Sequence, residues 1–262
     1  MKFEDLGLQP RLQAILAEQG ITDPTPIQKK AIPEALAGRD VMGLAQTGSG
    51  KTAAFGLPLI QAIMKIGTKP EPKTARSLIL APTRELAKQI TENLKAYTKG
   101  THLKVNLVIG GASINAQAQR LARGSDLLVA TPGRLIDLLE RKAIRLDEAR
   151  ILVLDEADQM LDMGFIHALR RIAPLLPAER QTMLFSATMP KLLNEIAATY
   201  LSDPVRAETA PPGKPADKVD QGLHYVQQAD KTALLIDYLD KHRDELALVF
   251  ARTKHGSERL KK

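Results

Sequence analysis

A glycine-rich segment, AQTGSGKT at residues 45–52, carries the residue types that bind phosphate. Its glycines allow close approach of the backbone, Lys51 supplies a positive charge, and the Thr52 hydroxyl is a ligand suited to Mg²⁺. Ala45 replaces the usual first glycine of the G-x-x-x-x-G-K-[ST] pattern. Because the segment follows an apolar run and precedes a helical pattern, we expect a phosphate-binding loop rather than an ordinary strand-to-helix turn.

A second polar group, DEAD at residues 155–158, ends the apolar run ILVL. A carboxylate at the tip of a strand can hold Mg²⁺ directly or through water, and the next carboxylate can orient or deprotonate an attacking water. Alone, such a tetrad is more often a solvated strand end. Together with the lysine loop, it predicts a site for phosphoryl transfer.

Gln28 ends the segment TDPTPIQ, which two prolines stiffen. A side-chain amide can accept a hydrogen bond from the adenine N6 amine and donate one to N7, which the guanine O6 does not permit. Gln28 is therefore a candidate reader of adenine, although a glutamine in a loop is usually only solvated. The sequence contains no N-K-x-D guanine motif, and a GTPase is disfavoured.

The composition excludes several classes of protein. The 262 residues carry a net charge of +7, which favours a polyanionic partner without proving one. The absence of cysteine excludes disulfide scaffolds and zinc sites with thiolate ligands. No signal peptide or apolar run of spanning length is present, so we expect a cytoplasmic protein without membrane contacts. Aromatic residues are only 3%, and backbone contacts should dominate if nucleic acid binds.

Short apolar runs alternate with amphipathic stretches between residues 39 and 207. Continuous apolar runs predict strands covered on both faces, and the intervening helices predict parallel crossovers. We therefore expect an α/β fold with a doubly wound, mostly parallel sheet, which binds ligands beyond the carboxyl ends of its strands. The predicted strands are 40–45, 77–82, 104–110, 126–132, 151–155 and 182–188.

The chain is predicted to contain one complete domain and the start of another. A Pro- and Gly-rich stretch predicts a linker at 208–217, which leaves residues 1–207 as the first domain. Residues 218–262 resemble the opening of another α/β unit, with two strands and about one and a half helices, too little to bury an independent core. The expected elements are strands 222–228 and 246–250, a helix at 232–242 and a helix that begins near His255.

Together these segments resemble the DEAD-box RNA helicases of superfamily 2, and in detail most resemble the bacterial RhlE-type subgroup. The likeness covers essentially the whole chain, and Ala45 matches the A-x-x-G-x-G-K-T form of that family. It implies a RecA-like P-loop domain and the start of a second RecA-like domain. The similar segments, from the Q motif through motifs I, Ia, Ib, II and III to motif IV, are 20–28, 45–52, 82–87, 131–134, 155–158, 186–188 and 248–253, with a GG pair at 110–111.

The resemblance also implies roles for individual residues, with ATP and Mg²⁺ as cofactors and RNA as a partner bound independently of its sequence. The implied ATP-binding residues are Phe3, Gln28, Ala45, Gln46, Thr47, Gly48, Ser49, Gly50, Lys51 and Thr52. Lys51, Asp155 and Glu156 are implied to be catalytic, and Thr52 and Asp155 to hold Mg²⁺ through water. Asp158, Ser186 and Thr188 are implied to couple nucleotide state to RNA binding. The implied RNA-binding residues are Pro82, Thr83, Arg84, Gly110, Gly111, Thr131, Pro132, Gly133 and Arg134.

Part of the RNA assignment follows from the residues themselves. Thr131 is a plausible N-cap and Pro132 a plausible first helical residue, so TPGR should begin a helix whose free N–H groups can meet a phosphate, although Thr-Pro alone often only caps a helix. Met160, Leu161, Met163 and Phe165 are expected in the core or a helix hinge rather than on a ligand surface.

The resemblance implies an ATP-dependent RNA helicase that couples ATP hydrolysis to local opening of RNA duplexes. The sequence contains no counterpart of motifs V and VI or of their arginine finger, so we expect the 262 residues to bind ATP or ADP and RNA with little turnover. Two alternatives stay open. One is a non-enzymatic, nucleotide-dependent RNA-binding module, and the other is a P-loop ATPase that acts on DNA, because contacts to the 2′-hydroxyl are not visible in a sequence. Ribonucleoprotein or RNA-decay partners are not identified by the sequence.

Overall fold

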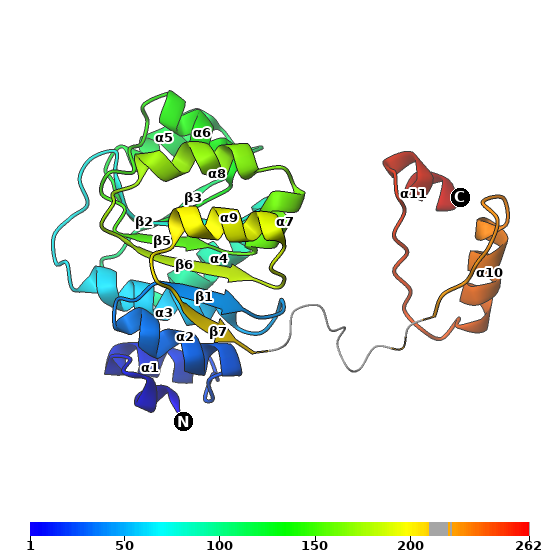
Figure 1. Ribbon diagram of the computed structural model, residues 1–262, viewed down its shortest axis with the longest axis horizontal. Helices are drawn as coiled ribbons and strands as arrows, with labels where there is room; N and C mark the ends of the chain where they lie inside the picture. The colour runs from blue at the N-terminus through cyan, green and yellow to red at the C-terminus, as the bar shows by residue number, and fades with distance from the viewer. Residues whose placement is uncertain (210–219, 221, 262) are drawn as a thin grey trace. The chain divides into compact units, whose positions relative to one another are not determined.

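The computed structural model describes residues 1–209, 220 and 222–261. The chain divides into two compact units, 1–214 and 215–262, which are described separately (Figure 1). Of the predicted linker 208–217, residues 210–217 lie outside the described part of the chain. The division into a domain of residues 1–207 and an incomplete second domain remains a prediction.

Within the described residues, the first unit contains a seven-stranded sheet in the order β3-β4-β2-β5-β6-β1-β7. All of its neighbouring strands are parallel, which confirms the predicted α/β architecture. The strands are β1 (Val41–Leu44), β2 (Ala75–Leu80), β3 (Val105–Val108), β4 (Ser125–Ala130), β5 (Ile151–Leu154), β6 (Gln181–Ser186) and β7 (Val205–Glu208).

The edge strand β7 is not among the strands that the sequence predicts. It pairs with β1, with Val205 opposite Val41. Only Ala207 among its four residues is buried, so no continuous apolar run marks the strand. Glu208, which the sequence analysis places in the linker, is the last residue of β7.

Helices cover both faces of the sheet (Figure 1). One layer contains the 3-10 helix η1 (Phe3–Leu6), α1 (Pro10–Glu18), α2 (Pro26–Leu36), α3 (Lys51–Met64) and α4 (Arg84–Tyr97). The other contains α5 (Ile114–Leu121), α6 (Pro132–Glu140), α7 (Ala157–Asp162), α8 (Ile166–Ile172), η2 (Ala173–Leu175) and α9 (Lys191–Tyr200).

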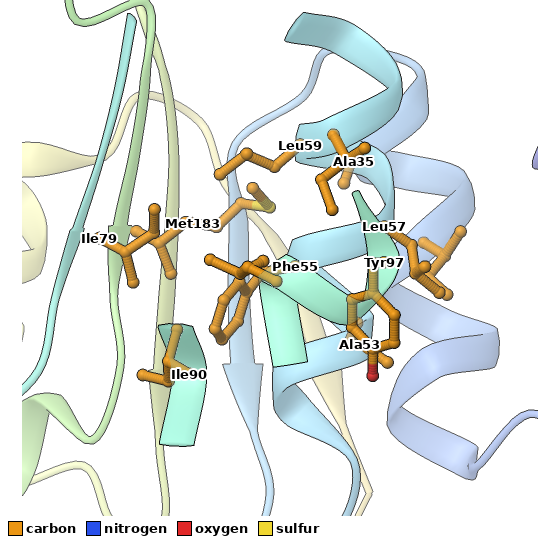
Figure 2. Packing of buried hydrophobic residues seen from close by; sticks show 14 of the residues in the cluster. Ala35, Ala53, Phe55, Leu57, Leu59, Ile79, Ile90, Tyr97 and Met183 are labelled. Atoms are coloured by element: carbon orange, nitrogen blue, oxygen red, sulfur yellow. The ribbon is translucent and has the colours of Figure 1, made fainter. Parts of the chain in front are cut away.

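The alternation of side chains along each strand produces two hydrophobic clusters. In β5, Val153 belongs to the cluster beneath the first helical layer, whereas Leu152 and Leu154 belong to the cluster beneath the second. Figure 2 shows the first cluster, in which Phe55 of α3 packs toward β6. The Phe55 and Phe185 ring centroids lie 5.6 Å apart. Burial on both faces holds the strands and therefore fixes where their carboxyl ends lie.

The second unit contains α10 (Lys231–Lys241) and α11 (Lys254–Leu260), in agreement with the two predicted helices. The predicted strands 222–228 and 246–250 are not formed in the described residues, which is a correction. A helix satisfies its own backbone hydrogen bonds, whereas a strand needs a neighbouring strand, and the described residues offer these segments none. Their apolar side chains are consequently exposed, including Leu223, Tyr225, Leu246, Leu248 and Phe250.

Candidate functional site

Three neighbouring strands, β5, β6 and β1, bring polar residues together at one half of the carboxyl edge of the sheet. Residues 155–158 follow β5, Ser186 is the last residue of β6, and 45–52 follow β1. These segments are far apart in the sequence and become neighbours only through the strand order. This half of the edge is the candidate nucleotide site.

Lys51 is the first residue of α3 and its side chain is buried. Its Nζ atom has no hydrogen-bond partner among the described residues. The preceding Gly50 has a φ of +89°, a left-handed conformation, and a Cβ atom there would lie 2.4 Å from Gln28 Nε2. A buried, unpartnered ammonium beside the positive end of a helix dipole fits an anion such as a phosphate.

Asp155 is only 2% exposed. Burial raises the pKa of this carboxyl to about 6, although the positive charge of Lys51 opposes the rise. Oδ1 of Asp155 accepts a hydrogen bond of 3.0 Å from the backbone N–H of Glu156. Because burial disfavours the charged carboxylate, a cation bound beside Asp155 would stabilise its ionised form.

The described residues contain no group of three or more His, Cys, Asp or Glu side chains that could hold a metal ion. Mg²⁺ is commonly held by one or two protein ligands, with phosphate oxygens and waters completing the octahedron. The buried Asp155 and the partly exposed Thr52 are suitable donors for that arrangement. They fit Mg²⁺ when a nucleotide supplies the phosphates.

Glu156 has left-handed backbone angles, φ 50° and ψ 53°, between β5 and α7. Such a conformation is uncommon outside glycine and is found at functional sites. Its Oε1 accepts a hydrogen bond of 3.1 Å from the Thr47 hydroxyl. The Glu156 carboxylate is thus held against the phosphate-binding loop.

Asp158, Ser186 and Thr188 form one hydrogen-bonded cluster. Asp158 Oδ2 accepts bonds from the Thr188 backbone N–H at 2.8 Å and from its hydroxyl at 2.7 Å. The Ser186 hydroxyl donates to the Thr188 carbonyl at 2.7 Å. Burial alone would raise the pKa of Asp158, but its hydrogen bonds, chiefly those with Thr188, together outweigh burial and hold this pKa below its usual value. The cluster connects the start of α7 with the end of β6.

Gln28 is buried in the first turn of α2, not solvated in a loop. Its Nε2 donates to the Gly50 carbonyl at 3.0 Å, and its Oε1 accepts from the Thr25 backbone N–H at 2.9 Å. An amide has a second N–H and a second lone pair, which are left for a base. Phe3 is only 5% exposed and lies in the first hydrophobic cluster, so it offers little ring surface.

The other half of the carboxyl edge contains a groove with a volume of about 600 Å³. It collects residues that follow the neighbouring strands β3, β4 and β2. All but one of the nine implied RNA-binding residues line it, and Pro132 is buried beside them as the first residue of α6. The lining residues are Pro82, Thr83, Arg84, Glu85, Gly110, Gly111, Thr131, Gly133, Arg134, Asp137, Met163 and Phe165.

Two helices begin at this groove. The Thr83 side chain caps α4 by accepting from the Leu86 N–H at 3.1 Å. Thr131 occupies the N-cap position of α6, as expected, but its side chain makes no capping bond there. The first N–H groups of each helix have no intrahelical acceptor and suit a phosphate oxygen.

The two arginines of the groove differ in their partners. Arg134 donates to the Ala112 carbonyl at 2.7 Å and pairs with Asp137 at 3.5 Å. Arg84 lies over the glycine pair, where a Cβ atom on Gly111 would come within 2.4 Å of its guanidinium. Gly111 also has a φ of +80°, and this left-handed conformation is what favours glycine there, because the flexible Arg84 side chain could move away from a Cβ atom.

The four apolar residues near α7 lie in the core or at the turn between α7 and α8, in agreement with the expected core or helix hinge. Met160 is fully buried and Leu161 packs against the core, as expected. Met163 and Phe165 bound the turn, and Phe165 packs against the core. Both also line the groove, and Met163 is 49% exposed. Gly164 lies between these two residues and has a φ of +77°. A glycine at this point is the sequence signal of the turn that places Met163 and Phe165 at the groove.

Comparison with known proteins is consistent with this geometry. The DEAD/DEAH box helicase family matches residues 25–196. The chain is 42% identical over 260 residues to the DEAD-box ATP-dependent RNA helicase CshA of Streptococcus pneumoniae serotype 4 (strain TIGR4) and to the protein of the same name in strain R6. In both cases the match covers 99% of this chain and 49% of the relative.

The chain therefore belongs to the DEAD/DEAH box helicase family, which confirms the resemblance stated from its motifs. It spans about half the length of the curated relatives that it matches. The finer likeness to the RhlE-type subgroup is not supported by these relatives and stays a prediction. No helix of the described residues is long and apolar enough to cross a bilayer.

Proposed function

We propose that this chain binds ATP or ADP with Mg²⁺ and also binds single-stranded RNA. In the whole protein, these sites would serve RNA-stimulated ATP hydrolysis coupled to local opening of RNA duplexes. The observation that carries the proposal is the buried, unpartnered Lys51 ammonium at the start of α3, whose charge acts on the buried Asp155 carboxyl. The names of the relatives, which are ATP-dependent RNA helicases, support it.

In the proposed nucleotide site, the phosphate-binding loop and its helix hold the phosphates. Lys51 would donate hydrogen bonds to phosphate oxygens, and Thr52 and Asp155 would hold Mg²⁺ through its waters. Bound Mg²⁺ would neutralise the charge that develops on the transferred phosphoryl group. The backbone of the loop would line the phosphates at Ala45, Gln46, Thr47, Gly48, Ser49 and Gly50.

Glu156 is proposed to orient the attacking water and to accept its proton. In this structure its carboxylate accepts a hydrogen bond from Thr47. Oε2 and the second lone pair of Oε1 are left to accept a bond from a water. The bond from Thr47 would therefore orient the general base relative to the phosphate-binding loop.

Gln28 is proposed to read adenine with the N–H and the lone pair that its two intramolecular bonds leave over. The same side chain holds the Gly50 carbonyl, so it contacts the phosphate-binding loop directly. Phe3 is proposed to support the base from the hydrophobic cluster beneath. Asp158, Ser186 and Thr188 are proposed to couple nucleotide state to RNA binding through their shared hydrogen bonds.

The groove is proposed to bind the RNA backbone without regard to sequence. Free N–H groups at the starts of α4 and α6 would meet phosphate oxygens, and Arg84 would add a positive charge. We also propose that the protein works in the cytoplasm.

The proposal is tested by measuring ATP hydrolysis without nucleic acid, with single-stranded RNA and with matched DNA, alongside ADP binding to the same sample. We expect ADP and RNA to bind, with slow turnover by the 262 residues alone. Failure to bind ADP would contradict the nucleotide site. A clear preference for DNA would favour a DNA-directed ATPase, and strong RNA-stimulated turnover would refute the expectation of slow hydrolysis.

A further inference from the structure

We propose that Met163 and Phe165 form an apolar wall of the groove that contacts the sugar and base of one nucleotide of bound RNA. The inference rests on the proposed RNA-binding function of this groove and names residues that the motifs do not include. The wall would supply affinity that the phosphate contacts do not.

The charges of the groove leave room for such a contribution. Its lining contains two cations, Arg84 and Arg134, and two anions, Glu85 and Asp137. These four formal charges cancel. A polyanion therefore gains little net Coulomb attraction from the lining as a whole, although the helix N-termini favour its phosphates locally.

One of the two cations is also already engaged. The Arg134 side chain is only 14% exposed and pairs with the Asp137 carboxylate. No hydrogen bond or ion pair of the Arg84 guanidinium is found within the described part of the chain, and Arg84 is exposed. Electrostatic attraction in the groove thus depends largely on Arg84, so a second source of affinity is expected for a strand that must be held.

The apolar wall is placed where a nucleotide bound at the start of α6 would meet it. The Phe165 N–H donates to the Met160 carbonyl at 3.0 Å, which closes the turn between α7 and α8. The Phe165 ring comes within 4.0 Å of the position of a Cβ atom on Gly133, the second residue of α6. A phosphate held by the N–H groups of that first turn would therefore place its sugar and base beside the ring.

Met163 supports the same interpretation because it presents an apolar side chain to the groove. Met160, three residues earlier in α7, is completely buried, whereas 49% of Met163, just after that helix, is exposed. Thioether and aromatic side chains pack well on the faces of bases. Such stacking tolerates any sequence, because every base has a π face. Such contacts agree with binding that does not depend on RNA sequence.

The test is the affinity of the 262-residue chain for a fluorescently labelled, unstructured RNA strand, measured from about 50 to about 200 mM salt. The variants are Met163→Ala, Phe165→Ala and Arg84→Ala. Leu175→Ala is the matched control, because Leu175 is similarly exposed, at 46%, but lies outside the groove. Thermal denaturation of each variant separates loss of binding from loss of folding.

We expect Met163→Ala to weaken RNA binding about fivefold and Phe165→Ala about tenfold, in the range of base stacking. Neither should change the slope of affinity against salt, since no counterion is released at an apolar contact. Arg84→Ala should weaken binding and reduce that slope by about 0.7. Leu175→Ala should bind RNA as the unchanged chain does.

Phe165 also packs against the core, so Met163→Ala decides the test if Phe165→Ala fails to fold. Wild-type affinity in Met163→Ala, together with weaker binding in Arg84→Ala, would overturn the wall and leave the proposed function standing. A reduced salt slope in Met163→Ala would overturn it as well. No RNA binding by the unchanged chain would remove both the wall and the RNA-binding part of the proposed function.

Discussion

The two halves of the carboxyl edge hold their charged groups in different surroundings. At the ends of β5, β6 and β1, Lys51 and Asp155 are both buried, and the Lys51 ammonium has no hydrogen-bond partner among the described residues. At the ends of β3, β4 and β2, Arg84, Glu85 and Asp137 are exposed to solvent. Burial makes each charge of the first half expensive and its interactions strong, whereas solvent weakens those of the second half.

This difference sets the size of the effects expected from single substitutions. In the buried half, one residue should control stability or binding by a large factor. In the groove, affinity is distributed over helix N-termini, one arginine and the proposed apolar wall, so each substitution should have a modest effect. Helix α7 joins the halves, because Asp155 and Glu156 precede it and Met163 follows it.

The largest effect is expected from Asp155→Asn on the stability of the metal-free chain. The pKa of Asp155 is raised from 3.8 in a model compound to about 6 by burial, against the opposing charge of Lys51. Between these two pH values the native chain binds more protons than the unfolded chain, so the free energy of unfolding falls as the pH rises. The difference corresponds to about 3 kcal/mol.

Asparagine resembles the protonated carboxyl, so the variant should be more stable than the unchanged chain above about pH 6 and nearly equal to it near pH 4. Urea denaturation of both chains in metal-free buffer across this range measures the difference. A constant difference at every pH would show that Asp155 does not titrate there, and the contrast between the two halves would lose its main support.

The next effect is expected on nucleotide binding from Lys51→Met. Methionine keeps most of the length of the side chain but removes the charge, and a hydrogen bond to a charged group contributes about 1.5–3 kcal/mol. ADP should therefore bind about 10- to 100-fold more weakly by calorimetry. Lys65→Met is the matched control, because Lys65 is exposed at the other end of the same helix. Equal losses in both variants would point to a general charge effect instead of a buried site.

Gln28→Ala should have a smaller effect that separates its two proposed roles. Loss of the contact with adenine should weaken ADP binding about tenfold and leave the weaker binding of GDP nearly unchanged. Loss of the bond to the Gly50 carbonyl alone should weaken ADP and GDP binding equally, because both nucleotides use the phosphate-binding loop. Competition between the two nucleotides on the unchanged chain and the variant distinguishes these outcomes.

The sequence predicts the buried half of the edge better than the groove. Asp155 directly follows a strand marked by a continuous apolar run, and Lys51 ends the glycine-rich loop between such a strand and a helix, so local pattern alone places both at this edge. The pairing of Arg134 with Asp137 is local, because the two residues lie three apart in α6. The balance of four charges, however, depends on the strand order, which brings the starts of α4 and α6 together. Met163 and Phe165 lie in the expected core or hinge, but their place in the groove is not visible in an apolar pattern at helical spacing.

The same distinction between local and non-local structure explains the other differences. Helices α10 and α11 form as predicted because their hydrogen bonds lie within each segment. Segments 222–228 and 246–250 have strand-like composition but find no neighbour in the described residues. Strand β7 is the reverse case, because it forms a strand without strand-like composition. Its pairing with β1 cannot be predicted from its own four residues.

The smallest effect is expected in the groove, from Asp137→Asn. The substitution removes the carboxylate that pairs with Arg134 at 3.5 Å, and the four charges of the lining then sum to +1 instead of zero. Because the Asp137 side chain is 55% exposed, solvent screens the pair, so RNA should bind only about two- to threefold more tightly. The slope of affinity against salt should become steeper, since Arg134 is released to neutralise a phosphate.

Asp147→Asn provides a control, because Asp147 is a similarly exposed partner of Arg145 outside the groove. If Asp137→Asn weakened RNA binding, the pair would have to orient Arg134 for the strand, and the groove would depend on a single charged contact as strongly as the buried half does.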